Sequence, residues 1–336
     1  MRFARKWSPV LLAMGLVGMG CQINQPECDS NCIDHWLDGP NYFDSSQDAL
    51  RGTPAFNARV RLSTRDSQPD SSQLRLPVII CVHGFAATTY EWSEFADTVA
   101  AYNAGRSDSI LVSRVLLGGH GGDIGEFQAS TWRDWQATVL KEYDTLVARG
   151  YQNISFAASS TGGPLLLEAF AAGAFQKQAP RHVYFIDPII VATDKFLTLA
   201  PILGPMIGNV EMEGTAEEQP YWYNNRPTEQ LTELYTLINR CKNRLEDGQK
   251  LPAGVSLKVY KSKKDESADP VSALYLKKGL RQSGGRPIAV EMVESKLHVF
   301  TRLAGREKVS ARDRQNQSRV FAEMIHDLSA SLAENP

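Results

Sequence analysis

Short apolar runs alternate along most of the chain with longer segments whose apolar residues recur at helical spacing. The run at 76–84 is continuously apolar and rich in β-branched residues, which is typical of a strand covered on both faces. We expect further strands at 109–117, 153–159, 182–190, 255–262 and 287–293. A segment at 58–63 alternates apolar and polar residues instead, which predicts a half-buried strand.

Helical stripes fall between these strands. We expect helices at 90–102, 131–149 and 164–175, the second of them ending at Gly150. A closing helix carries a buried stripe of Val320, Phe321, Met324, Ile325, Leu328 and Leu332. This alternation predicts an α/β fold with a mostly parallel central sheet and helices on both faces.

One segment interrupts the alternation. About sixty residues separate the strands that end near 190 and begin near 255, and we expect no strand among them. The part at 228–245 has a helical stripe, whereas 196–210 is apolar and interrupted by Gly and Pro. We interpret 196–250 as an inserted helical cap, with 196–210 as the core of the cap or the wall of an acyl pocket.

This cap divides the predicted fold. The α/β core would consist of residues 51–195 and 251–336, and residues 21–50 are polar and read as a tether.

The N-terminus has the pattern of an export signal. Arg2, Arg5 and Lys6 precede an apolar run that ends at Cys21. The run is too short to span a bilayer but suits the apolar region of a signal peptide. We therefore expect residues 1–20 to be a signal peptide.

The end of this segment, "VGMGC", resembles the lipobox of bacterial lipoproteins, although Gly18 stands where that motif usually has Leu. The resemblance implies that Cys21 is lipidated and becomes the mature N-terminus. Gln22 after it implies sorting to the outer membrane, facing the periplasm of a bacterial cell envelope. A plain secreted protein and an uncleaved anchor are the alternatives.

The net charge limits the classes of binding partner that we expect. The formal net charge is −2, and removal of the predicted signal peptide with its three basic residues makes it −5. The chain has no basic block that would follow phosphates, which argues against nucleic acid. Attachment to a membrane would rest on the N-terminal lipid anchor and not on a polybasic patch.

Four further cysteines remain. In an oxidising compartment Cys28 and Cys32, in "CDSNC", could form a disulfide, although four cysteines allow three pairings. Cys81 lies in an apolar strand and Cys241 on an apolar helix face, so we expect packed thiols. No histidine pair stands at ligand spacing near them, so we expect no metal site.

The stretch "AASSTGG" lies between an apolar strand and an apolar helix. A serine nucleophile on a tight strand-turn-helix elbow needs small residues two positions before and after it. Ser160 has Ala158 and Gly162 there, whereas Ser159 has the β-branched Thr161 on one side. We expect Ser160 to be the nucleophile. The alternative is a Ser/Gly cluster that only caps a helix or makes a turn.

Such a serine also needs donors for the oxyanion. "CVHGF" ends an earlier apolar strand, so the amide of Phe85, together with that of Thr161, would make the pair. We expect His83 in this motif to hold the loop by a hydrogen bond.

Six histidines are candidates for the base that would take the proton of Ser160. His298 alone lies in a loop just past the last strand and downstream of the serine and the acid, in the order Ser, Asp, His. His120 lies on the loop after 109–117 and could border the site. The remaining histidines fit less well: His35, His83, His182 and His326.

Two aspartates follow the strand 255–262. Asp265 is closer to the strand end and is our candidate for the acid. Asp269, before Pro270, is more typical of a turn or a helix cap, and Asp187, at the end of another strand, is a further alternative.

Together, "VHGF", "GGHGG", "SSTGG", "KKDESADP" and "SKLHVF", in this order and spacing, resemble the α/β-hydrolase superfamily. The most similar group is that of bacterial carboxylesterases and monoacylglycerol lipases, which carry a cap after the sixth strand. The resemblance covers roughly residues 75–330 and departs from the usual pattern at Ala158, where Gly is common. It implies the following roles: nucleophile Ser160, relay Asp265 and His298, oxyanion hole Phe85 and Thr161.

These residues predict a serine hydrolase that cleaves carboxylic esters through an acyl-enzyme. The substrate would be a small-molecule or lipid ester, such as a monoacylglycerol, and we expect no cofactor and no metal. "GHGGDIG" lacks the spacing of a phosphate-binding loop. The alternatives are an amidase or thioesterase with the same triad, or a non-catalytic lipoprotein that uses the fold for binding.

Overall fold

The computed structural model describes residues 70–122, 124–193, 209–211 and 221–333. The predicted signal peptide, the lipidation site Cys21, the tether with Cys28 and Cys32, and the predicted strand at 58–63 lie outside these residues.

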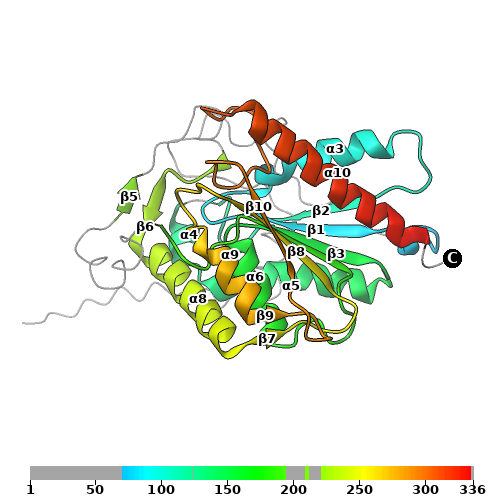
Figure 1. Cartoon of the computed structure of the whole chain (residues 1–336), viewed down its shortest axis with the longest axis horizontal. Coiled ribbons are helices and arrows are strands. Elements are labelled where there is room, and N and C mark those ends of the chain that lie inside the picture. Colours follow the sequence, from blue (N-terminus) through cyan, green and yellow to red (C-terminus); the bar gives the residue numbers. More distant parts are fainter. Residues whose placement is uncertain (1–69, 123, 194–208, 212–220, 334–336) are drawn as a thin grey trace, which may run out of the picture.

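A six-stranded sheet forms the centre of the molecule (Figure 1). Its order is β10-β8-β4-β3-β1-β2, and every neighbouring pair is parallel. The bounds are β1 Val78–Val82, β2 Leu111–Val115, β3 Ile154–Ser159, β4 His182–Ile186, β8 Ser256–Ser262 and β10 Ala289–Val293. All six correspond to strands expected from the apolar runs, and the mostly parallel sheet is confirmed.

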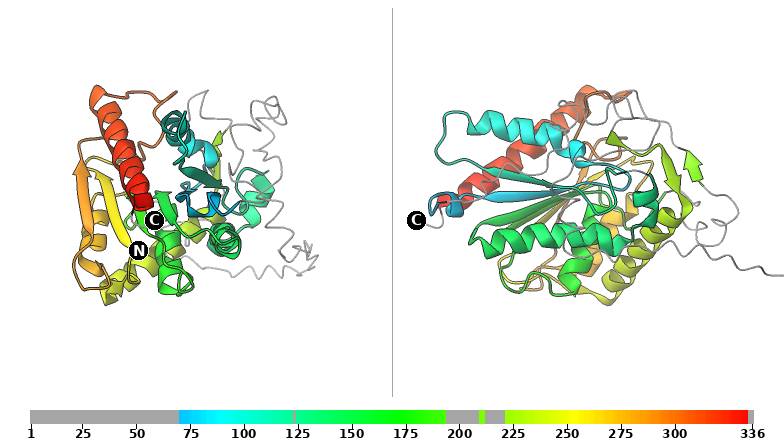
Figure 2. Two further views of the ribbon diagram at one scale, coloured as in Figure 1. Left: turned by 90° about the vertical axis from the view of Figure 1, so that its right-hand side faces the viewer. Right: turned by 180° about the vertical axis from the view of Figure 1, so that it is seen from behind.

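Helices cover both faces of this sheet (Figures 1 and 2). On one face lie α3 Ser93–Asn103 and α10 Ala311–Ala333. On the other face lie α5 Trp132–Ala148, α6 Gly162–Ala171, α8 Thr228–Asp247 and α9 Val271–Gly279. The pattern did not predict α9, nor the short helices η2 Gln73–Arg75 and α4 Ile124–Ala129. The short helix η3 Thr89–Trp92 forms the start of the helix expected at 90–102.

Strand β1 shows how one strand supplies both cores. Val78, Ile80 and Val82 pack into the cluster with α5 and α6, while Ile79 and Cys81 face α3 and α10. Side chains alternate between the faces of a strand, and both faces here are covered. This explains the continuous apolar run from which the strand was predicted.

Strand β4 ends earlier than its apolar run. The run extends to 190, but the strand stops at Ile186 because Asp187 turns the chain with a φ of 47°. Pro188 follows and cannot donate a ladder hydrogen bond. Hydrophobicity alone therefore overestimated this strand by four residues.

The segment expected to hold no strand contains short ones. β5 Asn209–Glu211 pairs with β6 Asn225–Pro227, and β7 Gln249–Lys250 pairs with β9 Leu280–Arg281. Strands of two or three residues are too short to show a period. That expectation was therefore wrong for the described residues.

Helix α8, which the stripe at 228–245 predicted, packs against α6 and α9. Its buried side chains join the same hydrophobic cluster as the sheet face: Leu231, Leu234, Leu237, Ile238, Cys241 and Leu245. The division into core and cap stays a prediction, since 194–208 and 212–220 lie outside the described residues. In the part of the chain that the structure describes, no helix has the length and apolar character needed to cross a membrane.

Candidate active site

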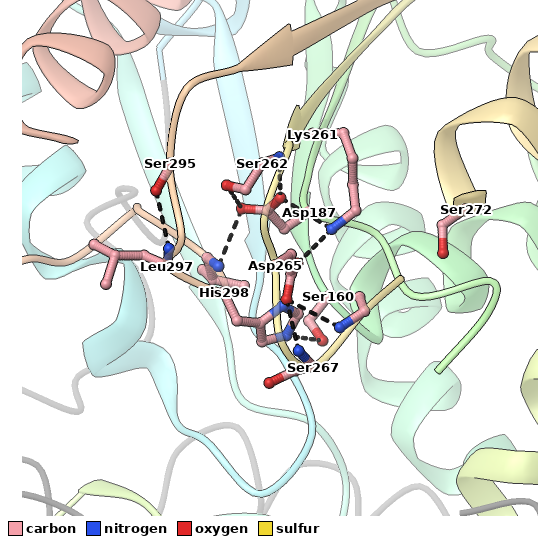
Figure 3. Close-up of polar contacts among 12 residues, drawn as sticks. Ser160, Asp187, Lys261, Ser262, Asp265, Ser267, Ser272, Ser295, Leu297 and His298 are labelled. Atoms are coloured by element: carbon pink, nitrogen blue, oxygen red, sulfur yellow. Dashed lines mark hydrogen bonds and ion pairs between the residues drawn. The ribbon is translucent and has the colours of Figure 1, made fainter. Parts of the chain in front are cut away.

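The candidate residues gather at the carboxyl edge of the sheet. Ser160 follows β3, Asp187 follows β4, Asp265 follows β8 and His298 follows β10. Figure 3 shows these side chains directed toward one another. Parallel strands end at one edge, so residues far apart in the sequence meet there.

Ser160 lies on a strained turn between β3 and α6. Its φ is 46°, and its amide donates to the Ile186 carbonyl at 3.0 Å. A Cβ on Gly162 would stand 2.8 Å from the Val82 carbonyl oxygen and 3.2 Å from the Ala158 Cβ. The turn therefore needs small residues at both flanking positions, which is the geometry of a nucleophile elbow.

A hydrogen-bonded relay connects the three predicted residues. His298 Nε2 lies 2.8 Å from Ser160 Oγ, and His298 Nδ1 lies 2.8 Å from Asp265 Oδ2. Because a carboxylate only accepts, Nδ1 donates to Asp265 and Nε2 is left to accept the serine proton. The structure thus brings Ser160, His298 and Asp265 together in the order that the sequence predicted.

The Asp265 carboxylate is held from its other side as well. Its Oδ1 accepts from the amides of Ser267 at 2.8 Å and Ala268 at 3.0 Å. Burial opposes ionisation, but the contacts with His298 and Lys261 outweigh it and lower the pKa of Asp265 to about 2. A group of this kind stays charged at any pH at which the histidine can act as a base.

The predicted oxyanion donors lie beside the serine. A Cβ on Gly84 would be 3.1 Å from the Ser160 Cβ, so this loop passes close to the nucleophile. Gly84 N donates to Glu91 and Ala86 N to His120, while the Phe85 amide has no protein acceptor among the described residues. The amide of Thr161, at the start of α6, likewise has no acceptor among the described residues.

Two buried histidines fix this loop. His83 Nδ1 donates to the Gly84 carbonyl at 2.8 Å, and its Nε2 accepts from Leu117 N at 3.1 Å. His120 Nε2 accepts from Ala86 N at 3.3 Å. Burial lowers the pKa of His83 to about 4 and that of His120 well below its usual value. Both are therefore neutral structural residues, as expected for His83; His120 lies behind the loop without reaching Ser160.

Glu91, in η3 at the end of the loop after β1, was not predicted from the sequence. Its Oε1 accepts from Gly84 N at 3.0 Å and also from the Ser159 hydroxyl. Burial raises the pKa of Glu91, while the bond from Ser159 lowers it. The Ser159 hydroxyl thus shares its one proton between Glu91 and the Val82 carbonyl at 3.2 Å, whereas the Ser160 hydroxyl faces His298.

The structure also places the alternatives. Asp187 does not contact the His298 ring; it binds Lys261 and the backbone after His298. Asp269 accepts from Val271 N at 2.8 Å and so stabilises the turn before α9. His182 begins β4, and His326 is exposed on α10, so neither belongs to the site.

The packed thiols are confirmed, because Cys81 and Cys241 are buried and free. Among the described residues, no group of three or more His, Cys, Asp or Glu is placed to hold a metal ion.

Comparison with solved structures identifies the fold. The chain resembles a structure reported with the metagenome-derived lipolytic enzymes LipS and LipT, with 18% identity over 75% of this chain and 94% of the other and a TM-score of 0.57. A monoacylglycerol lipase from Paleococcus ferrophilus matches at 12% identity over 76% and 96%, with a TM-score of 0.56. The monoglyceride lipase of Saccharomyces cerevisiae, in a soluble variant with a substrate analogue, matches at 11% over 81% and 95%, with a TM-score of 0.57.

The protein therefore has the α/β-hydrolase fold, as its motifs predicted. No protein-family model and no curated protein matches its sequence. At such low identities the likeness to solved structures extends to the fold alone.

Proposed function

We propose that this protein is a serine hydrolase that cleaves carboxylic esters through an acyl-enzyme. The observation that carries the proposal is the continuous relay Ser160–His298–Asp265, with the serine at a φ of 46° between a strand and a helix. The lipases and esterases that share the fold support an ester as substrate.

The geometry suggests the role of each group. His298 Nε2 takes the proton of Ser160 as Oγ attacks the ester carbonyl, and Asp265 stabilises the imidazolium that forms. The uncommitted amides of Phe85 and Thr161 would hold the oxyanion. His298 then gives its proton to the departing alcohol, and a water activated by the same histidine releases the acid.

Replacement of the nucleophile tests the proposal. Ser160→Ala should abolish hydrolysis of nitrophenyl esters and labelling by a fluorophosphonate probe. Ser159→Ala is the matched control, since it removes the neighbouring hydroxyl, which contacts Glu91 and not His298; its labelling should persist. Labelling of Ser160→Ala at the wild-type rate would overturn the assignment, and a series of acyl chain lengths, with amides and thioesters beside it, would define the substrate.

We further propose, from the sequence, that Cys21 carries the lipid anchor and that the enzyme acts on lipid esters at the outer membrane of a bacterial envelope. Cys21→Ser should then move the protein from the membrane fraction to the soluble fraction and stop incorporation of labelled fatty acid. Fatty-acid incorporation into the serine variant would contradict this.

A further inference from the structure

A buried lysine lies behind the relay. Lys261, near the end of β8, and Asp187, after β4, are both fully buried, and Lys261 Nζ lies 3.2 Å from Asp187 Oδ1. The same ammonium also binds Asp265 Oδ2. Figure 3 shows Lys261 between the two carboxylates, on the side away from Ser160.

Lysine and histidine share one oxygen of Asp265. Oδ2 accepts both from His298 Nδ1 and from Lys261 Nζ. A cation on that oxygen cancels the charge that must stabilise the imidazolium. Lys261 and Asp265 by themselves would present no net charge to His298.

Asp187 restores that charge. It accepts from three groups that can only donate, namely the Lys261 ammonium, Ser262 N at 2.6 Å and Val299 N at 3.1 Å. Burial raises the pKa of Asp187 above its usual value, and the contacts with Lys261 and Ser262 N offset this only in part. The Ser262 hydroxyl also donates to Asp187 Oδ2 at 3.0 Å, so every hydrogen bond of this side chain is one that it accepts, as expected for a carboxylate paired with the Lys261 ammonium. Asp187, Lys261 and Asp265 then carry one net negative charge.

Asp187 also reaches the histidine loop. Its Oδ2 binds the amide of Val299, the residue directly after His298, and Val299 has a φ of 58°. A β-branched residue rarely adopts this conformation without a fixed partner. One carboxylate therefore contacts the lysine behind the acid and the backbone beside the base.

We propose that Asp187 and Lys261 are positioning residues that set the basicity of His298. Lys261 holds Asp265 in place and weakens its pull on the imidazole, and Asp187 balances the lysine charge and anchors the histidine loop. The inference rests on the proposed function, in which His298 is the base.

Two further charged groups act on His298. Glu91 approaches from η3, and the charges of His298 and Arg306 both act on it. Arg306 lies on the loop of His298 and donates to the carbonyls of His298 at 2.8 Å and Val299 at 2.6 Å. Both remain in place in the variants below, so differences between the variants report on Asp187 and Lys261.

The two single variants should act in opposite directions. Asp187→Asn leaves the lysine charge on Asp265 unbalanced, so the titration midpoint of the His298 ring should fall by about one pH unit. Lys261→Met removes the donor that competes for Asp265 Oδ2, so the midpoint should rise by about one unit. The double variant should return it close to the wild-type value, since both charges are gone.

The experiment is an NMR titration of the His298 ring in the full chain with Ser160→Ala, together with the acid limb of the kcat/KM profile in the active protein. Lys258→Met is the matched control: this lysine lies on the same strand but pairs with Glu291 and Glu323, so the midpoint should not move. Shifts of both single variants in one direction, or none, would overturn the proposal.

Folding and function can be separated in this design. If Asp187→Asn does not fold, Lys261→Met and the double variant decide, and a midpoint in Lys261→Met that stays or falls refutes the inference. If the wild-type chain hydrolyses no ester, the proposed function fails, while the NMR midpoints still test the charge relation.

Discussion

The two sides of Ser160 use histidine in opposite ways. On the β1–β2 side, His83 and His120 are fully buried and bind loop backbone. On the β8–β10 side, the His298 side chain is 25% exposed and joins a carboxylate to the serine hydroxyl. The same residue type holds a loop in one half and can move a proton in the other.

The difference lies in the partners. An imidazole that accepts from a backbone amide, as His83 does from Leu117 N, stays neutral, and its burial lowers its pKa to about 4. An imidazole that donates to Asp265 is stabilised when it gains a proton. The acid at the other ring nitrogen therefore distinguishes the candidate base His298 from His83.

Removal of the proposed base should give the largest effect. His298→Gln should lower kcat by on the order of 10⁴-fold, because no group remains to take the serine proton. Ester hydrolysis by purified variants measures this. His326→Gln, at a side chain 80% exposed on α10, is the control and should be fully active. If His298→Gln were active, His298 would not be the base, and its proposed role would not differ from the structural role of His83 and His120.

The free energy of unfolding should fall at acid pH, because the buried histidines are neutral in the folded protein. The pKa of His83 is about 4 in the folded protein, against an ordinary value of 6.5. Between these two pH values His83 is protonated in the unfolded chain but neutral in the folded protein. The free energy of unfolding should therefore be highest above pH 6.5 and fall as the pH drops toward 4, by roughly 3 kcal/mol from His83 alone.

Urea unfolding at several pH values checks this. His83→Gln should flatten the dependence, whereas His326→Gln should keep the wild-type slope. Equal slopes for wild type and His83→Gln would show that His83 is not held neutral.

The elbow itself can be probed at Ala158. Ala158→Val should crowd Gly162, because the Ala158 Cβ lies only 3.2 Å from where a Cβ on Gly162 would stand, and it should cost about 1–3 kcal/mol of unfolding free energy and most of the activity. Ala158→Gly should keep the activity at a cost of about 0.5–1 kcal/mol. Thermal denaturation and probe labelling measure both, and normal labelling of the valine variant would contradict the geometry of this turn.

The smallest effect on activity is expected from the conservative variant Glu91→Gln. Glu91→Gln keeps an oxygen that can accept from Gly84 N and Ser159, so the free energy of unfolding should change by less than about 1 kcal/mol. Glu91→Leu leaves the buried Gly84 amide without an acceptor and should cost about 1–3 kcal/mol. Equal losses in the two variants would mean that the charge, not the acceptor, holds the oxyanion loop.

Much of the fold could be predicted because its signals are local. Each of the six predicted segments contains one strand of the sheet, and the signal is clearest in β1, which is buried on both faces and apolar throughout. The short strands β5 and β7 and the helix α9 were missed. Their residues pack against segments that are distant in the sequence. These elements are also too short for a repeating pattern of apolar and polar residues to be recognised.

The sequence alone determined the strands of the sheet, and it was enough to predict Ser160 in preference to Ser159 and the order Ser, Asp, His. Those features depend on neighbours a few residues away and on chain order. Only the tertiary structure showed what Glu91, Asp187 and Lys261 contact, because charges in apolar surroundings are stabilised by partners from other strands. Lys261 stands beside the apolar Val259 and Tyr260 in β8, but only the order in which the strands pack decides which carboxylates pair with it.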